Sequence, residues 1–171
     1  ALGDYAAALA TVEAALANVA REPQPDPGRH GLCEVIAGTA LAGLGRGTEA
    51  VPRLVRGLEA LASAADGANL LEVFINAGLV FELVGRPDLA LDPYRRALRI
   101  AAAHLDSAHR MQVTVRRLLG RALVATEAHD EAAKVLAEAV SIAERVLPED
   151  DADRAAVHAA LAAARAAVAG R

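Results

Sequence analysis

Residues 71–100 read LEVFINAGLVFELVGRPDLALDPYRRALRI, and this stretch decides the fold. The apolar positions of its first half follow the three-and-four spacing of one helix face: Leu71, Phe74, Ala77, Gly78 and Phe81. The second half shows the same period from Ala90 to Leu98. Gly85 and Pro87 stand between the halves, and proline is tolerated in the first turn of a helix. The stretch therefore predicts two helices joined by a short turn.

The same unit recurs along the whole chain. One alanine after a turn marks each copy: Ala8, Ala50, Ala90 and Ala132. These alanines are separated by 42, 40 and 42 residues. A glycine lies twelve residues before each of the last three: Gly38, Gly78 and Gly120. Two landmarks with the same even spacing indicate an internal repeat of 40–42 residues.

The period and its breaks predict eight helices, at about residues 4–21, 30–44, 48–63, 68–84, 87–104, 107–126, 129–146 and 152–168. The composition agrees, because 54% of the residues are hydrophobic but only 2% are aromatic. Alanine is the strongest helix former and allows helices to pack closely in thin layers. Each pair is too thin to bury its apolar face alone, so we expect stability to come from stacking on neighbouring pairs.

The order of residues within these units resembles the tetratricopeptide repeat (TPR) family. The third unit carries the family pattern of large, small and turn residues: Phe74, Ala77, Gly78, Phe81, Gly85, Ala90, Tyr94 and Ala97. The second and fourth units carry it in part, with Gly38, Leu41, Gly45, Ala50 and Leu54, and with Leu119, Gly120, Leu123, Ala132, Leu136 and Ala139. Departures are Glu34 and Arg116 at the first large position, Gly57 for the last alanine, and Glu127 for a turn glycine.

The resemblance implies an all-α fold, a right-handed α-solenoid of antiparallel helix pairs with about eight helices. It implies one array over residues 1–171, with a truncated repeat and loop at 1–29, repeats at 30–67, 68–106 and 107–148, and a capping helix at 149–171. The repeat is longer than the usual 34 residues. In this it is similar to the repeats of kinesin light chains and of bacterial signalling ATPases and transcription activators.

Composition and charge favour a cytoplasmic protein. The formal net charge is −4, which argues against a broad nucleic-acid-binding surface. The single cysteine, Cys33, excludes an internal disulfide and fits a reducing compartment. No apolar run is long enough for a membrane span, and there is no signal-peptide pattern. The chain begins inside a helical pattern, so we expect a fragment of a longer protein, and its Ala, Arg and Gly content suggests a GC-rich bacterial genome.

The sequence contains no catalytic or metal-binding motif. Gly-rich phosphate loops, HExxH, CxxC and GxSxG patterns are absent. The five histidines are scattered, and Cys33 has no basic neighbour in sequence to lower its pKa. We therefore expect no enzymatic activity and no cofactor.

The resemblance places a binding surface on the first helix of each pair, where the family lines its concave groove. The corresponding positions are Leu32, Val35, Thr39, Glu72, Ile75, Leu79, Glu82, Arg110, Thr114, Arg117 and Arg121. The groove would be apolar at Val35, Ile75 and Leu79 and basic at the arginines. Arginine binds an acidic group through forked, charge-assisted hydrogen bonds. The alternative is that these arginines are ordinary surface charges paired with Glu82 or Asp106, which would imply no ligand.

The sequence thus predicts a non-enzymatic scaffold that binds a protein or peptide segment, with an acidic group as an optional anchor. Neither nucleic acid nor a membrane is an expected partner. The alternative function is a domain that senses a ligand or peptide within a larger bacterial signalling ATPase or transcription regulator. Helix 4–21 lacks a preceding partner helix, and its uncovered apolar flank is a candidate homodimer contact.

Overall fold

The computed structural model describes residues 2–24, 26–62 and 67–170, and these contain eight α-helices. The helices are α1 (Leu2–Val19), α2 (Pro27–Gly43), α3 (Gly47–Ala62), α4 (Leu71–Leu83), α5 (Pro87–His104), α6 (Arg110–Ala125), α7 (His129–Val146) and α8 (Ala152–Ala169). A short 3-10 helix, Ala68–Leu70, precedes α4, and the described residues contain no strand. The predicted order of eight helices is confirmed. The last residue of the expected helix 48–63 and the end residues 1 and 171 lie outside the described ranges.

Three helices begin three residues away from the predicted positions. The α4 helix begins at Leu71 because the 3-10 helix Ala68–Leu70 takes up the first three expected residues. The starts of α2 and α6 differ because of the turns that precede them. The α2 helix starts early, since the Asp26 side chain accepts a hydrogen bond from the Gly28 N–H at 2.9 Å and Pro27 occupies the first turn. The α6 helix starts late, since the Asp106 side chain accepts from the Ala108 N–H at 2.7 Å and holds a turn there.

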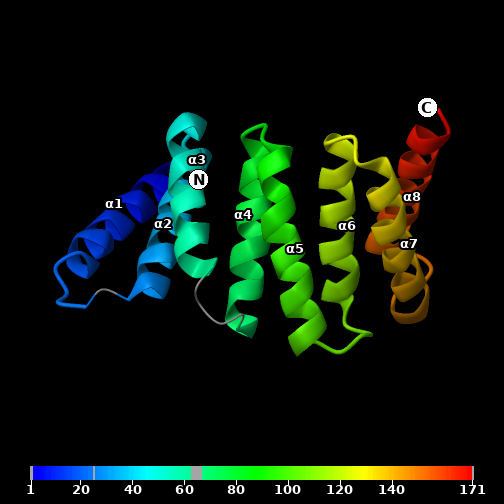
Figure 1. Ribbon diagram of the computed structural model, residues 1–171, viewed down its shortest axis with the longest axis horizontal. Helices are drawn as coiled ribbons and strands as arrows, with labels where there is room; N and C mark the ends of the chain where they lie inside the picture. Colours follow the sequence, from blue (N-terminus) through cyan, green and yellow to red (C-terminus); the bar gives the residue numbers. More distant parts are fainter. Residues whose placement is uncertain (1, 25, 63–66, 171) are drawn as a thin grey trace. The chain divides into compact units, whose positions relative to one another are not determined.

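The chain forms two compact units, residues 1–66 with 79–85, and residues 67–78 with 86–171. In the first unit α2 packs against both α1 and α3. In the second unit α5 packs on α6, α6 on α7 and α7 on α8, and α8 also contacts α6 (Figure 1). The expected limits of the individual repeats stay a prediction.

A glycine on the first helix of three pairs lies directly beneath a large side chain of the second. A Cβ built on Gly38 would lie 2.6 Å from Leu54 Cγ, and one on Gly78 would lie 2.6 Å from Tyr94 Cζ. A Cβ on Gly120 would likewise meet the end of the Leu136 side chain. Real Cβ atoms do not come this close to other carbons. The glycine landmarks seen in the sequence are therefore the points where paired helices approach most closely.

Three of the four aromatic residues occupy the core. Phe74, Phe81 and Tyr94 are each no more than 1% exposed. In the second unit the guanidinium of the buried Arg96 lies 4.6 Å from the centroid of the Phe74 ring, a cation–π arrangement. Tyr5 differs, because it is 41% exposed.

The turns after α2, α4 and α6 share a residue in the left-handed backbone region: Gly45, Gly85 and Glu127, with φ of 75°, 76° and 62°. Glu127 thus takes the conformation of the glycine that it replaces. The helix ends still close normally, because the Ala128 N–H donates to the Leu123 carbonyl at 2.9 Å, as the Arg46 N–H does to the Leu41 carbonyl. The departure at Glu127 leaves the repeat intact at the cost of local strain.

Gly78→Ala is expected to lower the free energy of unfolding by about 2–3 kcal/mol, because the new methyl group would overlap the Tyr94 ring. Urea denaturation followed by circular dichroism measures the effect. Gly3→Ala is the matched control, since Gly3 is also helical but an added methyl group there would have no neighbour within 4 Å. That variant should keep or slightly raise stability. Equal losses in both variants would contradict the close approach at Gly78.

Candidate binding site

The predicted basic stripe lies on α6 and faces the first turn of α8. Arg110 pairs with Asp151, and its Nη1 donates to Asp153 Oδ2 at 2.7 Å. Arg117 Nη2 lies 3.5 Å from Asp153 Oδ1. From the sequence, Glu82 and Asp106 were the alternative ion-pair partners of these arginines. In the structure Arg110 pairs with Asp151 and Asp153, and Arg117 with Asp153, because α8 returns to pack on α6.

Asp151 also begins α8. Its Oδ1 accepts hydrogen bonds from the backbone N–H groups of Asp153 at 2.8 Å and Arg154 at 3.4 Å. Desolvation raises the pKa of Asp151, but the Asp153 N–H and the Arg110 guanidinium outweigh it, and the pKa lies below its usual value. The carboxylate therefore caps the helix and holds Arg110 at the same time.

A cavity of about 210 Å³ opens between α6, α7 and α8. It is lined by Arg117, Arg121, Val124, Leu136, Ala156, Ala160 and Ala163. The alanines are spaced by four and three residues along one face of α8. The Nε of Arg117 is buried and has no hydrogen-bond acceptor among the described residues. Two of the predicted arginines thus meet at an apolar hollow rather than on a flat charged surface.

The predicted apolar part of the groove differs from expectation. Val35 is 4% exposed and Ile75 is 8% exposed, so both belong to the core and offer little contact surface. Val35 is buried because it packs against α3 at Gly57. Leu79 remains 38% exposed, and Leu32 is half-buried.

The polar positions of the predicted groove are spread over three helices. Thr39 Oγ1 on α2 donates to the Val35 carbonyl at 2.9 Å, and Thr114 Oγ1 on α6 lies 3.5 Å from the Arg110 carbonyl. On α4, Glu72 is exposed and Glu82 is half-buried. Of the residues predicted to form a site, Arg110, Arg117 and Arg121 are the ones that contact α8 or line the cavity beside it.

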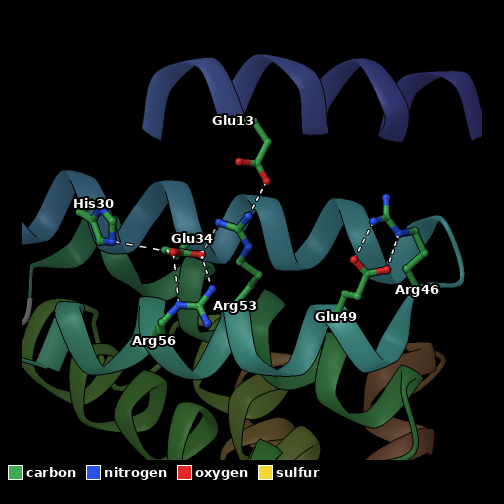
Figure 2. Close-up of polar contacts among 7 residues, drawn as sticks. All are labelled: Glu13, His30, Glu34, Arg46, Glu49, Arg53 and Arg56. Carbon is green, nitrogen blue, oxygen red and sulfur yellow. Dashed lines mark hydrogen bonds and ion pairs between the residues drawn. The ribbon is translucent and has the colours of Figure 1, made fainter. Parts of the chain in front are cut away.

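The first unit holds a charged network that the sequence did not predict (Figure 2). Its centre is Glu34 on α2, whose side chain is 6% exposed. Arg53 on α3 reaches Glu34 Oε2 at 3.1 Å and Glu13 Oε1 of α1 at 2.6 Å. Arg56 Nε lies 3.4 Å from Glu34 Oε1, and His30 Nε2 lies 3.8 Å from the same oxygen. The network therefore ties all three helices of the α1–α3 group together.

Local packing explains why the carboxylate is buried. The α2 and α3 backbones touch where two glycines face each other, since a Cβ on Gly31 would lie 2.8 Å from the Gly57 carbonyl and the reverse distance is the same. This crossing brings Glu34 beside Arg53 and Arg56 of α3. The available signal in the sequence was Glu34 itself, an acidic residue at a position where a large apolar one was expected.

A wide depression of about 720 Å³ lies elsewhere in the first unit, lined by Tyr5, Ala42, Gly43, Gly45, Gly47, Thr48, Leu83 and Val84. Leu83 is 71% exposed there. Tyr5 packs over Gly43, where an added Cβ would lie 2.6 Å from the ring. The homodimer contact expected at the first helix stays a prediction.

None of the helices in residues 2–24, 26–62 and 67–170 is long and apolar enough to cross a membrane. Within the same ranges, no three His, Cys, Asp or Glu side chains come together as a metal site.

Comparison with solved structures gives consistent matches over nearly the whole chain. Two structures of a kinesin-light-chain-type protein with nearly identical TPR-like repeats, from Podosopora anserina, are each 22% identical. They match 99% of this chain and 81% of their own, with a TM-score of 0.78. This chain has the TPR-like repeat fold. BtubC (BKLC) from P. vanneervenii matches 98% of this TPR-like chain and 67% of its own, at 19% identity and a TM-score of 0.73.

No family model matches the sequence of this TPR-like chain, and no curated protein matches it significantly. The matches to solved structures confirm the resemblance to TPR-like repeats at the level of the fold.

Glu34→Ala is expected to lower the free energy of unfolding by about 1–3 kcal/mol, because two arginines lose their shared buried acceptor. Chemical denaturation measures the change. The control is Glu49→Ala on the same α3 helix as the two arginines, which breaks the exposed pair with Arg46 at 2.7 Å and should matter much less. A larger loss in the Glu49 variant would overturn the assigned role of the network.

Asp151→Asn tests the charge at the start of α8, since asparagine is also a good helix cap. A carboxyl group whose pKa is lowered by folding stabilises the protein above its unfolded pKa and loses that effect as pH falls through the folded pKa. The parent should therefore exceed the variant in urea midpoint at about pH 5–8, and the difference should shrink as the pH falls below the unfolded pKa of about 4. A difference that stays constant as the pH falls below about 4 would show that charge is not the cause.

Proposed function

We propose that this TPR-like chain is a non-enzymatic interaction scaffold that binds a segment of a partner protein. The observation that carries the proposal is the cavity between α6, α7 and α8, lined by two arginines and three alanines, on a fold built from stacked helix pairs. Such pairs present successive helices side by side and create extended binding surfaces. The matched kinesin-light-chain-type structures support the same general class of function.

The partner segment is one that carries an acidic group next to an apolar side chain. Arg117 and Arg121 supply the cationic side of the cavity, while Val124, Leu136 and the α8 alanines supply the apolar side. The Nε of Arg117 is a buried donor with no acceptor among the described residues. The function therefore centres on α6 and α8 rather than on the buried Val35 and Ile75.

The second candidate is a sensor domain that binds a small ligand within a larger regulatory protein. The observation in its favour is the size of the cavity, which at about 210 Å³ suits a small molecule as well as a side chain. In that case the helix array would transmit ligand binding to neighbouring domains of its own chain.

The test is capture of a partner from lysate of the source cells, comparing the parent with the double variant Arg117→Glu/Arg121→Glu. The matched control is Arg99→Glu/Arg145→Glu, which makes the same change of charge at exposed positions on α5 and α7. We expect a partner that the parent and the control retain and that the α6 variant loses.

Retention by all three proteins would contradict the placement of the site. Failure of the parent to capture any protein would contradict the scaffold and leave the sensor as the better account. Circular dichroism of each variant verifies that the helices remain folded.

A further inference from the structure

The cavity between α6, α7 and α8 has an apolar body and a cationic side, and the two parts come from different elements. Leu136 of α7 and Ala156, Ala160 and Ala163 of α8 form the body. Arg117 and Arg121, one helical turn apart on α6, provide the charge. A ligand that fits must combine an alkyl portion with an anionic head group.

We propose that this cavity binds a small aliphatic monocarboxylate of about six to eight carbons. This proposal rests on the proposed function in one respect, since both place binding at this cavity. It adds the chemical class of a small ligand. The hollow is open to solvent on one side, because Arg121 and Ala163 are exposed while Leu136 at its base is buried. Its volume of about 210 Å³ gives room for a short alkyl chain against Leu136 and the α8 alanines. The alanine and leucine side chains offer no hydrogen-bond donor, so they match the alkyl chain and not the head group.

The arginine chemistry selects a carboxylate as the head group. A guanidinium presents N–H donors in a planar fork that matches the two oxygens of a carboxylate. Arg117 is half-buried, and its Nε has no acceptor among the described residues. An alcohol would supply a single oxygen without charge, and an ammonium group would be repelled. The site therefore discriminates by charge as well as by shape.

Asp153 is the internal competitor for this ligand. Its contact with Arg117 is long, at 3.5 Å, while its contact with Arg110 is short, at 2.7 Å. A bound carboxylate can take the place of Asp153 at Arg117 while Asp153 keeps its bond to Arg110. Weakening this competition should strengthen ligand binding.

Isothermal titration calorimetry of the intact 171-residue chain with hexanoate tests the proposal. We expect saturable binding with a Kd below about 5 mM, a range consistent with the ligand efficiency of small molecules. Acetate should bind at least about tenfold more weakly, because it lacks the buried methylene groups. Hexan-1-ol and hexan-1-amine should not bind measurably.

Three variants locate the ligand. Arg117→Gln should weaken hexanoate binding by about tenfold, since it removes a charge-assisted hydrogen bond. Ala160→Leu should abolish binding by filling the cavity, and it leaves both arginines in place. Asp153→Asn should strengthen binding by about threefold, as expected for loss of a competing charge. Arg145→Gln on α7 lies outside this cavity and is the control that should bind like the parent.

The proposal is overturned if hexanoate does not bind the parent, or if Ala160→Leu binds as the parent does while remaining folded by circular dichroism. Those results leave the scaffold function standing, because partner capture is tested separately, by charge reversal at Arg117 and Arg121, and does not depend on hexanoate. Hexanoate binding without partner capture would instead retain the ligand site and reject the scaffold.

Discussion

The close approach of two helices at a glycine is the constraint on which this structure depends. In each of three helix pairs a glycine of the first helix lies beneath a leucine or tyrosine of the second. The absent side chain allows the two backbones to come together, and the large residue then fills the space that remains. The second helices of these pairs also carry fully buried alanines, Ala50, Ala90 and Ala132. Thin layers of this kind are built from small residues, which explains the alanine-rich and aromatic-poor composition.

The same constraint shapes the polar features. Where α2 and α3 touch at Gly31 and Gly57, the short distance between the two backbones brings Glu34 against the arginines of α3, which enclose it. Where α8 packs on α6, alanine side chains are too short to fill the space beside Arg117. The network that joins the helices of the first unit and the cavity beside Arg117 thus both follow from the small residues at these helix contacts.

The sequence predicted the helices and the repeat because both are local patterns. The spacing of Phe74, Phe81 and Tyr94 placed them in the core, where they are found. The Glu34 network was not predictable, since its arginines lie 19 and 22 residues away and meet it only through the α2–α3 crossing. The pairing of Arg110 with Asp153 spans 43 residues and depends on the return of α8 to α6. Val35 was expected at the surface because the family resemblance places groove positions along a single helix. It does not include α3, which packs against Val35 at Gly57.

A double-mutant cycle at Gly120 and Leu136 tests the central claim most directly. Gly120→Ala introduces a methyl group against the end of the Leu136 side chain, and Leu136→Ala removes that end. The account predicts that the cost of Gly120→Ala, measured as the change in the free energy of unfolding, falls by at least about 1 kcal/mol in the Leu136→Ala background. An equal cost in both backgrounds would show that the glycine is not required for the approach of the two helices, and would contradict the account.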